Sequence, residues 1–236
     1  MLSFEQRIRK TIGDNRLMSS DQSVVVGVSG GPDSICLLQV LSSLYSELSI
    51  VCVYVDHNLR PEEAVQERNL VEAYCHQKSL DCITVSVDVP AEVDATGESI
   101  EACARWLRYE ALEEVRRSRN ADVIAVGHTA DDQVEEVLLR LIRGTGLTGL
   151  SGMRPKYGRV VRPLLEVTRQ EILVYLQENH LAFCEDSSNQ SNRFLRNRIR
   201  LELLPILEER FNPSIRNTIL NTAKILEIEE DYLSSE

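Results

Sequence analysis

Short apolar runs alternate with longer segments of helical periodicity along the first 143 residues. Each run is rich in β-branched residues and apolar on both faces, as strands buried inside a parallel sheet are. The four runs are 23–29, 50–56, 82–87 and 121–127. The helical segments lie near 33–46, 62–79, 98–118 and 131–143. This alternation predicts βαβ units, and therefore an α/β fold with a doubly wound, mostly parallel sheet. We expect five strands.

The strand pattern fades after Pro163, and the rest of the chain is predicted to be helical. Helices are expected near 168–179, 196–210 and 213–231, with Pro213 separating the last two. We therefore place a domain boundary near 205–212. Residues 1–207 would form the catalytic domain, and residues 208–236 a small helical extension or the beginning of a further domain.

The first strand continues directly into the loop Ser29-Gly30-Gly31-Pro32-Asp33-Ser34, and an apolar helix follows. Two glycines allow a sharp turn and a close approach to a ligand, while proline suits a first helical turn. The free amides of that turn and the hydroxyls of Ser29 and Ser34 predict an anion site for phosphates. The loop is not a Walker A motif, because no Gly-Lys-Ser/Thr follows. The alternative is a plain strand-to-helix turn.

Acidic and histidine side chains follow the strands at the edge where the loop lies. A carboxylate beside phosphates needs a cation, so Asp33 is predicted to hold Mg²⁺. Asp56-His57 ends the second strand and His128 follows the fourth, which places all three on the nucleotide side. His57 could equally be a loop histidine that caps a helix. Asp132 is a candidate second Mg²⁺ ligand if the first and fourth strands are neighbours, although acidic residues in a first turn are commonly only partners of the helix dipole.

Two groups of arginines stand out. In the segment 98–118, Arg105 and Arg108 belong to a polar stripe, which is usually a solvated helix face. The second group lies within eight residues, and it is either an ordinary helix face or a site for RNA or ATP phosphates. Its members are Arg193, Arg196, Arg198 and Arg200.

The loop SGGPDS resembles the SGG-x-DS loop of the PP-loop ATP pyrophosphatases, which cleave ATP to AMP and pyrophosphate. Four further segments extend the resemblance to the tRNA(Ile)-lysidine synthetase family, over residues 23 to about 207. They are VDHNLR at 55–60, ESIEACARWLRYEAL at 98–112, GHTADDQVEEVLLRLIRGTGLTGLSGM at 127–153, and EDSSN with RNRIR-x-x-LLP at 185–205.

The resemblance implies a Rossmann-like, adenine nucleotide alpha hydrolase fold and a ligase that uses ATP and Mg²⁺. The wobble cytidine of a tRNA(Ile) with a CAU anticodon would be adenylated, and free lysine would then displace AMP to give lysidine. It also assigns Arg105 and Arg108 to the phosphates or to the acidic groups of bound lysine. Glu135 shares a helix face with Asp132, three residues before it, and is a candidate partner for the lysine ammonium group if the first and fourth strands are neighbours. About 30 residues follow the last motif, whereas many family members carry further domains, so we expect a short or C-terminally truncated form.

Composition changes this picture only in part. The net charge of -11 argues against a large phosphate-binding surface on average, although the arginine groups are locally basic. The six cysteines form no C-x-x-C pair, which favours free thiols in a reducing cytosol over disulfides, zinc or an iron–sulfur cluster. A tRNA cytidine thiolase of the same fold, which would need paired cysteines, is therefore the weaker alternative. Amide-forming PP-loop synthetases share the loop but lack GHTADDQVEE with RNRIR.

From another class of protein, a nucleotide-binding regulatory module remains open. No apolar run reaches about 18 residues, so we expect a cytoplasmic protein without a membrane partner. A homodimer is left open.

Overall fold

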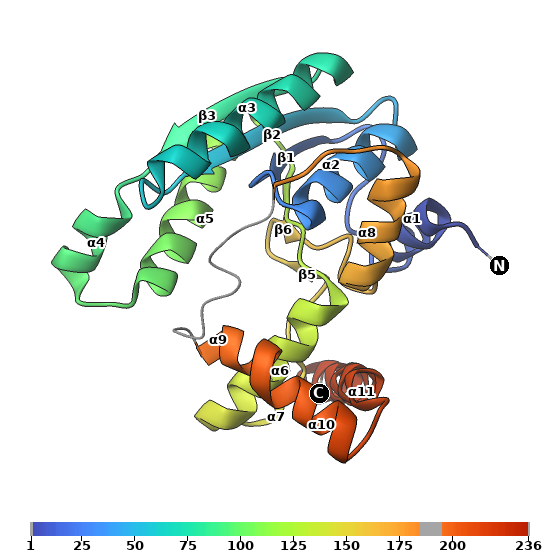
Figure 1. Ribbon diagram of the computed structural model, residues 1–236. Coiled ribbons are helices and arrows are strands. Elements are labelled where there is room, and N and C mark those ends of the chain that lie inside the picture. Colours follow the sequence, from blue (N-terminus) through green and yellow to red (C-terminus); the bar gives the residue numbers. More distant parts are fainter. Residues whose placement is uncertain (1, 185–194, 236) are drawn as a thin grey trace.

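A computed structural model describes residues 2–184 and 195–235. Within them, one six-stranded sheet has the order β3-β2-β1-β4-β6-β5 (Figure 1). The strands are β1 Ser23–Gly27, β2 Ser49–Asp56, β3 Asp81–Ser86, β4 Val123–Ala125, β5 Lys156–Tyr157 and β6 Val160–Val161. The expected doubly wound, mostly parallel sheet is confirmed, and β4 does pair with β1. Five strands run parallel, and the additional β5 is antiparallel to β6.

The helices predicted from periodicity are present, close to their expected bounds. They are α2 Pro32–Leu44, α3 Pro61–Lys78, α5 Ile100–Ser118, α6 Ala130–Arg143, α8 Arg169–Glu178, α10 Leu204–Arg210 and α11 Ile215–Ser235. The segment expected near 196–210 is one helical stretch of three parts, because α9 Leu195–Arg198 and a π-helical turn, Ile199–Leu203, precede α10. Three helices were not predicted. They are α1 Phe4–Asp14, α4 Val89–Thr96 and α7 Leu147–Leu150.

Helices cover both faces of the sheet, and each face has its own hydrophobic core. Successive side chains of a strand point to opposite faces, so Val24 and Val26 of β1 belong to one core, together with residues of α1, α2, α3 and α8. Val25 points the other way, into a core with Leu112 and Val115 of α5. The strands are therefore buried on both faces, as the apolar runs predicted.

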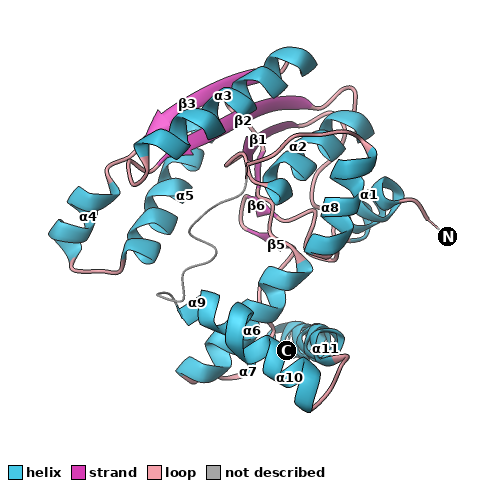
Figure 2. Cartoon of the chain, in the orientation of Figure 1, coloured by secondary structure: helices cyan, strands magenta, loops and turns pink. Residues whose placement is uncertain are grey.

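The C-terminal helices pack away from the sheet, against α6 and α7 (Figure 2). Val134 and Leu138 of α6 share a core with Ile199 and Leu204, which belong to the π turn and α10. Helix α6 thus joins the two parts of the molecule, because it begins at the end of β4 and ends among the C-terminal helices. Among the described residues, every helix is too short or too polar to cross a membrane.

Candidate functional site

The loop between β1 and α2 exposes the start of a helix. Gly31 is the N-cap residue in an extended conformation, and no side chain caps α2. The amides of the first turn are therefore left for a ligand, and the helix dipole favours an anion there. Gly30 has φ +82°, a left-handed conformation that suits glycine.

The two serines of the loop brace it from inside. Ser34 Oγ accepts a hydrogen bond from the Ser29 amide at 3.1 Å and donates one to the Gly31 carbonyl at 2.9 Å. The hydroxyl oxygens of Ser29 and Ser34 are 3.3 Å apart. Their first function is thus to fix the curvature of the loop, although both residues also face the cavity described next.

A cavity of about 470 Å³ opens beside this loop, at the carboxyl ends of the parallel strands. It is lined from β1, β2, α5, α6 and the helical stretch that starts at Leu195. Eleven of the predicted site residues line it: Ser29, Gly31, Asp33, Ser34, His57, Arg105, Arg108, His128, Asp132, Arg196 and Arg200. Five described ones are not part of its lining: Gly30, Pro32, Asp56, Glu135 and Arg198. Arg193 and the EDSSN segment lie outside the described residues.

Asp33 points an unsatisfied carboxylate oxygen into this environment. Its Oδ1 atom is buried and has no hydrogen-bond partner among the described residues. The pKa of Asp33 is raised to about 6, chiefly by burial; the charge of Arg169 opposes this rise and that of Asp132 adds to it. A buried, unpartnered carboxylate beside a phosphate loop fits a hard divalent cation such as Mg²⁺.

Asp132 fits a metal less well, because its carboxylate already has partners. Its Oδ2 atom accepts hydrogen bonds from the Thr129 amide at 2.9 Å and the Thr129 hydroxyl at 3.0 Å, in a capping box. Its Oδ1 atom lies 3.5 Å from the guanidinium of Arg196. Burial opposes the charged form, but Arg196, His128 and Thr129 together hold the pKa of Asp132 below its usual range. A metal at Asp132 would have to share these oxygens.

Glu135 is enclosed rather than open to a ligand. Its side chain is 1% exposed, and each carboxylate oxygen faces an arginine. Oε2 lies 2.9 Å from Arg196 Nε, and Oε1 lies 2.5 Å from Arg200 Nε. A lysine ammonium would have to displace one of these groups, so the geometry favours a positioning role in which Glu135 aims the two arginines at the cavity.

The C-terminal arginines divide according to helical spacing. Arg196 and Arg200 are four residues apart and share the face toward the cavity. Arg198 lies on another face, is 58% exposed, and is 3.6 Å from Glu202. The sequence predicts one cluster of these arginines, although their i, i+4 spacing could have placed Arg196 and Arg200 on a different helix face from Arg198.

Two histidines in the cavity wall are neutral at physiological pH. Burial, followed by the charge of Arg108, lowers the pKa of His57 to about 4, and its buried Nδ1 has no partner among the described residues. Burial lowers the pKa of His128 to about 3, and its Nδ1 accepts a hydrogen bond from Arg162 at 3.2 Å. Both can therefore exchange hydrogen bonds with a ligand without carrying charge. Asp56 instead accepts a hydrogen bond from the Asn58 amide.

Arg105 and Arg108 enter the cavity from α5. Both guanidinium groups lie over the ring of Tyr109, at 5.3 and 5.7 Å from its centroid. Burial lowers the pKa of Arg108, and its Nε is buried with no acceptor among the described residues. A buried donor of this kind is costly until an anion pairs with it.

Several contributors were not singled out from the sequence. A Cβ at Gly127 would meet the Asp33 carbonyl oxygen at 3.0 Å, so glycine lets the end of β4 touch the start of α2. The Cys184 amide donates to the Gly30 carbonyl at 2.9 Å, and Cys184 lines the cavity. Gly127 could have been suspected from its place after a strand, opposite the loop. Cys184 carries no such signal, because its contact is long-range.

The loop, the buried Asp33 and the surrounding arginines are the features of a nucleotide-binding PP-loop domain. Residues 1–207 match the PP-loop domain family, and the chain belongs to that family. It is 42% identical over 224 residues to the tRNA(Ile)-lysidine synthase of Parabacteroides distasonis, covering 94% of this chain and 50% of the relative. It is 36% identical over 233 residues to the tRNA(Ile)-lysidine synthase of Bacillus subtilis, covering 97% of this chain and 49% of the relative. The chain thus spans about half the length of these relatives.

Among solved structures, the chain is similar to a U34-tRNA thiolase, NcsA from Methanococcus maripaludis, with its [4Fe-4S] cluster. The TM-score is 0.75 at 21% identity, over 94% of this chain and 78% of the other. At this identity the likeness confirms the fold only, and the chemistry has to be inferred from the residues of the site.

Proposed function

We propose that the chain carries out the ATP-dependent ligation of lysine to the wobble cytidine of a tRNA(Ile) with a CAU anticodon. The observation that supports it most directly is the cavity, which gathers the phosphate loop, Asp33 and five arginines around one space. The similarity to tRNA(Ile)-lysidine synthases gives the substrate class.

ATP would place its phosphates at the start of α2. The uncapped amides after Gly31 donate to phosphate oxygens, and the nearby arginines neutralise the charge that builds on the pyrophosphate as it leaves. Arg108 fits this task because its buried Nε has no acceptor among the described residues.

Asp33 would hold Mg²⁺, which when bound would offset the repulsion between the triphosphate and the carboxylates around it. Asp132 would support this arrangement from the helix start opposite, through its charge and its contact with Arg196.

The reaction would have two steps. The cytidine ring oxygen O2 attacks the α-phosphorus of ATP, an O–P bond forms, and pyrophosphate leaves. The ε-amino group of lysine then attacks ring carbon C2, a C–N bond forms, AMP leaves with O2, and the amine gives up a proton. Adenylation turns a poor leaving oxygen into a good one. In both steps the leaving group is a phosphate, so the groups that bind phosphate are the ones that stabilise the transition states.

RNA would approach from the neighbouring cavity of about 540 Å³, because Arg105 lines both spaces. Its wall carries arginines and two tyrosines, of which Tyr157 is 73% exposed. Splayed single-stranded bases stack on such rings, and arginines contact their phosphates. A cytidine held there would lie next to Arg105, which also lines the nucleotide cavity.

A thiolase is the second candidate, because NcsA shares the fold of this chain. Among the described residues that line the nucleotide cavity, Cys184 is the one cysteine. Sulfur transfer to a base commonly needs a thiolate pair or a cluster at the reacting atoms, and that arrangement is not found among the described lining residues.

The test is incorporation of labelled lysine into a tRNA(Ile) transcript with a CAU anticodon, in the presence of ATP and Mg²⁺. We expect lysine in the RNA together with equal amounts of AMP and pyrophosphate. A transcript with the wobble cytidine replaced by uridine is the matched control and should accept none. Release of pyrophosphate without lysine transfer, but with sulfur transfer from a persulfide donor, would favour the thiolase instead.

A further inference from the structure

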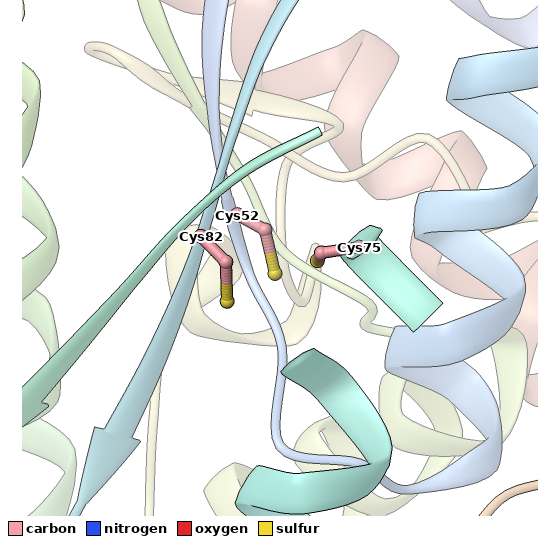
Figure 3. A group of neighbouring side chains, drawn as sticks. All are labelled: Cys52, Cys75 and Cys82. Atoms are coloured by element: carbon pink, nitrogen blue, oxygen red, sulfur yellow. The ribbon is translucent and has the colours of Figure 1, made fainter. Parts of the chain in front are cut away.

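Three cysteine side chains from three separate elements converge under helix α3. Cys52 of β2 and Cys82 of β3 are Cα partners in a parallel strand pair, so their side chains lie side by side on one face of the sheet. Cys75, in the last turns of α3, approaches from the helix that covers that face (Figure 3). The three Sγ atoms all lie within 4.8 Å of one another.

The cluster is buried, but one of its three cysteines is accessible to solvent. Cys52 is 0% exposed and Cys75 1%, and both belong to the core that α3 shares with the sheet. Cys82 is only partly buried, so an ion could enter from its side.

This cluster is distinct from the nucleotide cavity. Cys52 sits midway along β2 and Cys82 near the start of β3, whereas the cavity opens at the carboxyl ends of the strands. None of these three cysteines belongs to the cavity lining. The cluster therefore serves neither ATP binding nor sulfur transfer at that site.

We propose that Cys52, Cys75 and Cys82 form a binding site for one closed-shell thiophilic metal ion, Zn²⁺ or Cu⁺. An ion bonded to three thiolates at about 2.3 Å holds them about 4 Å apart, which the present separation nearly meets. Thiolate sulfur is the ligand that both ions prefer. On binding, three metal–sulfur bonds form, and the thiol protons leave to solvent. No electron is transferred.

The alternative is that the thiols are simply small apolar side chains in a core, which is the commonest state of a buried free cysteine. Two features favour the metal. Three sulfurs meet at one point, and the in-register pairing of two of them on adjacent strands fixes their spacing before any ion arrives. A bound ion would tie the end of α3 to the outer strands of the sheet.

The test uses the complete chain, reduced and freed of metal with a chelator. Zn²⁺ and Cu⁺ are titrated separately against chromophoric chelators that compete for each ion. We expect one ion per chain, and an affinity that falls at least about 10-fold in Cys75→Ala. Cys103→Ala is the matched control, because Cys103 is a buried thiol on α5 outside the cluster. It should bind as the wild type does.

A second measurement separates native binding from capture of unfolded thiols. The ion should raise the thermal unfolding midpoint of the wild type and of Cys103→Ala, but not that of Cys75→Ala. If Cys75→Ala does not fold, Cys82→Ala takes its place, since that side chain is partly exposed. If only Zn²⁺ binds, the three thiolates are joined by a fourth ligand from water. If only Cu⁺ binds, the ion is three-coordinate. Both results support the proposal. The proposal would be overturned by any of three results. The cluster variant and the control could bind the ion with equal stoichiometry and affinity, neither ion could bind, or the ion could lower the unfolding midpoint.

Discussion

Glu135 and Arg200 form a two-point ion pair. Arg200 Nε lies 2.5 Å from one carboxylate oxygen of Glu135, and its terminal nitrogen lies 3.0 Å from the other. Arg196 shares the second oxygen. Because Glu135 belongs to α6 and the arginines to the C-terminal helical stretch, this one carboxylate fixes the two cationic side chains that close the nucleotide cavity.

Replacing Glu135 by alanine should destabilise the chain and weaken both half-reactions. Two partly buried guanidinium groups would lose their nearest carboxylate, a change that costs about 3 kcal/mol. We expect a fall of that size in the free energy of unfolding, measured with urea. Pyrophosphate release and lysine transfer should fall by the same factor, and Glu135→Gln, which keeps an acceptor, should lose less. A selective loss of lysine transfer would instead support direct contact between Glu135 and lysine.

Asp33→Asn should stabilise the metal-free protein while inactivating it. Burial raises the pKa of Asp33 to about 6, so the folded state binds more protons than the unfolded state between about pH 4 and 6. Stability that comes from this group is present below that window and is lost as the pH rises through it. The difference of about two units corresponds to about 2–3 kcal/mol.

The expected result is an unfolding free energy for Asp33→Asn about 2 kcal/mol above that of the wild type near pH 8, with a flatter profile between about pH 4 and 6. The same variant should lose ATP-dependent lysine incorporation, because the ligand of the proposed metal is gone. Urea unfolding across the pH range and a turnover assay measure the two effects. An active Asp33→Asn would refute the metal assignment.

Gly127→Ala should weaken ATP binding without a large change in the core. The new methyl group would lie 3.0 Å from the Asp33 carbonyl oxygen, which would push the end of β4 away from the loop. We expect the dissociation constant of ATP, measured by calorimetry, to rise at least about 10-fold. Gly13→Ala is the control, since a Cβ there meets nothing within 4 Å. Unchanged ATP affinity would show that the contact is not needed.

Arg198→Ala should affect RNA binding and leave ATP binding intact. Arg198 is 58% exposed, does not line the nucleotide cavity, and among the described residues has only the exposed ion pair with Glu202 at 3.6 Å, so it is accessible to an external phosphate. Loss of one phosphate contact lowers the slope of log affinity against log salt by about 1. Filter binding of tRNA at several salt concentrations measures this. Arg117→Ala, which removes a 74% exposed arginine from α5, is the control and should keep the wild-type slope.

Tyr157→Ala should raise the KM for tRNA and leave the affinity for ATP unchanged. Stacking of a base on an aromatic ring contributes about 1–3 kcal/mol, so a rise of at least about fivefold is expected. Tyr157→Phe retains the ring and should behave as the wild type. If the alanine variant also behaves as the wild type, the second cavity does not receive RNA.

The sheet and its long helices followed from the sequence because their signals are local. The apolar runs that became β1 to β4 each carry their own pattern, and the phosphate loop is read within six residues. Helix α1 was missed although Ser3 and Gln6 form a capping box, since its apolar pattern is short. Strands β5 and β6 have two residues each, too few for any periodicity.

The candidate site was predicted less completely, because its contacts join distant parts of the chain. The cavity brings Asp33 and Arg200 together, and only the fold brings them close. Sequence spacing could not show that the Glu135 carboxylate pairs with two arginines. Nor could it show that Cys52, Cys75 and Cys82 meet, since the spacing of these cysteines matches no familiar metal motif.

The position of Arg196 and Arg200 has a consequence for synthesis on the ribosome. The phosphate loop emerges early, but the wall opposite it is completed only when the helical stretch after Leu195 has left the exit tunnel and docked on α6. Until that stretch has emerged, a nascent chain carries an open, incomplete pocket. We therefore expect nucleotide capture to follow this docking step.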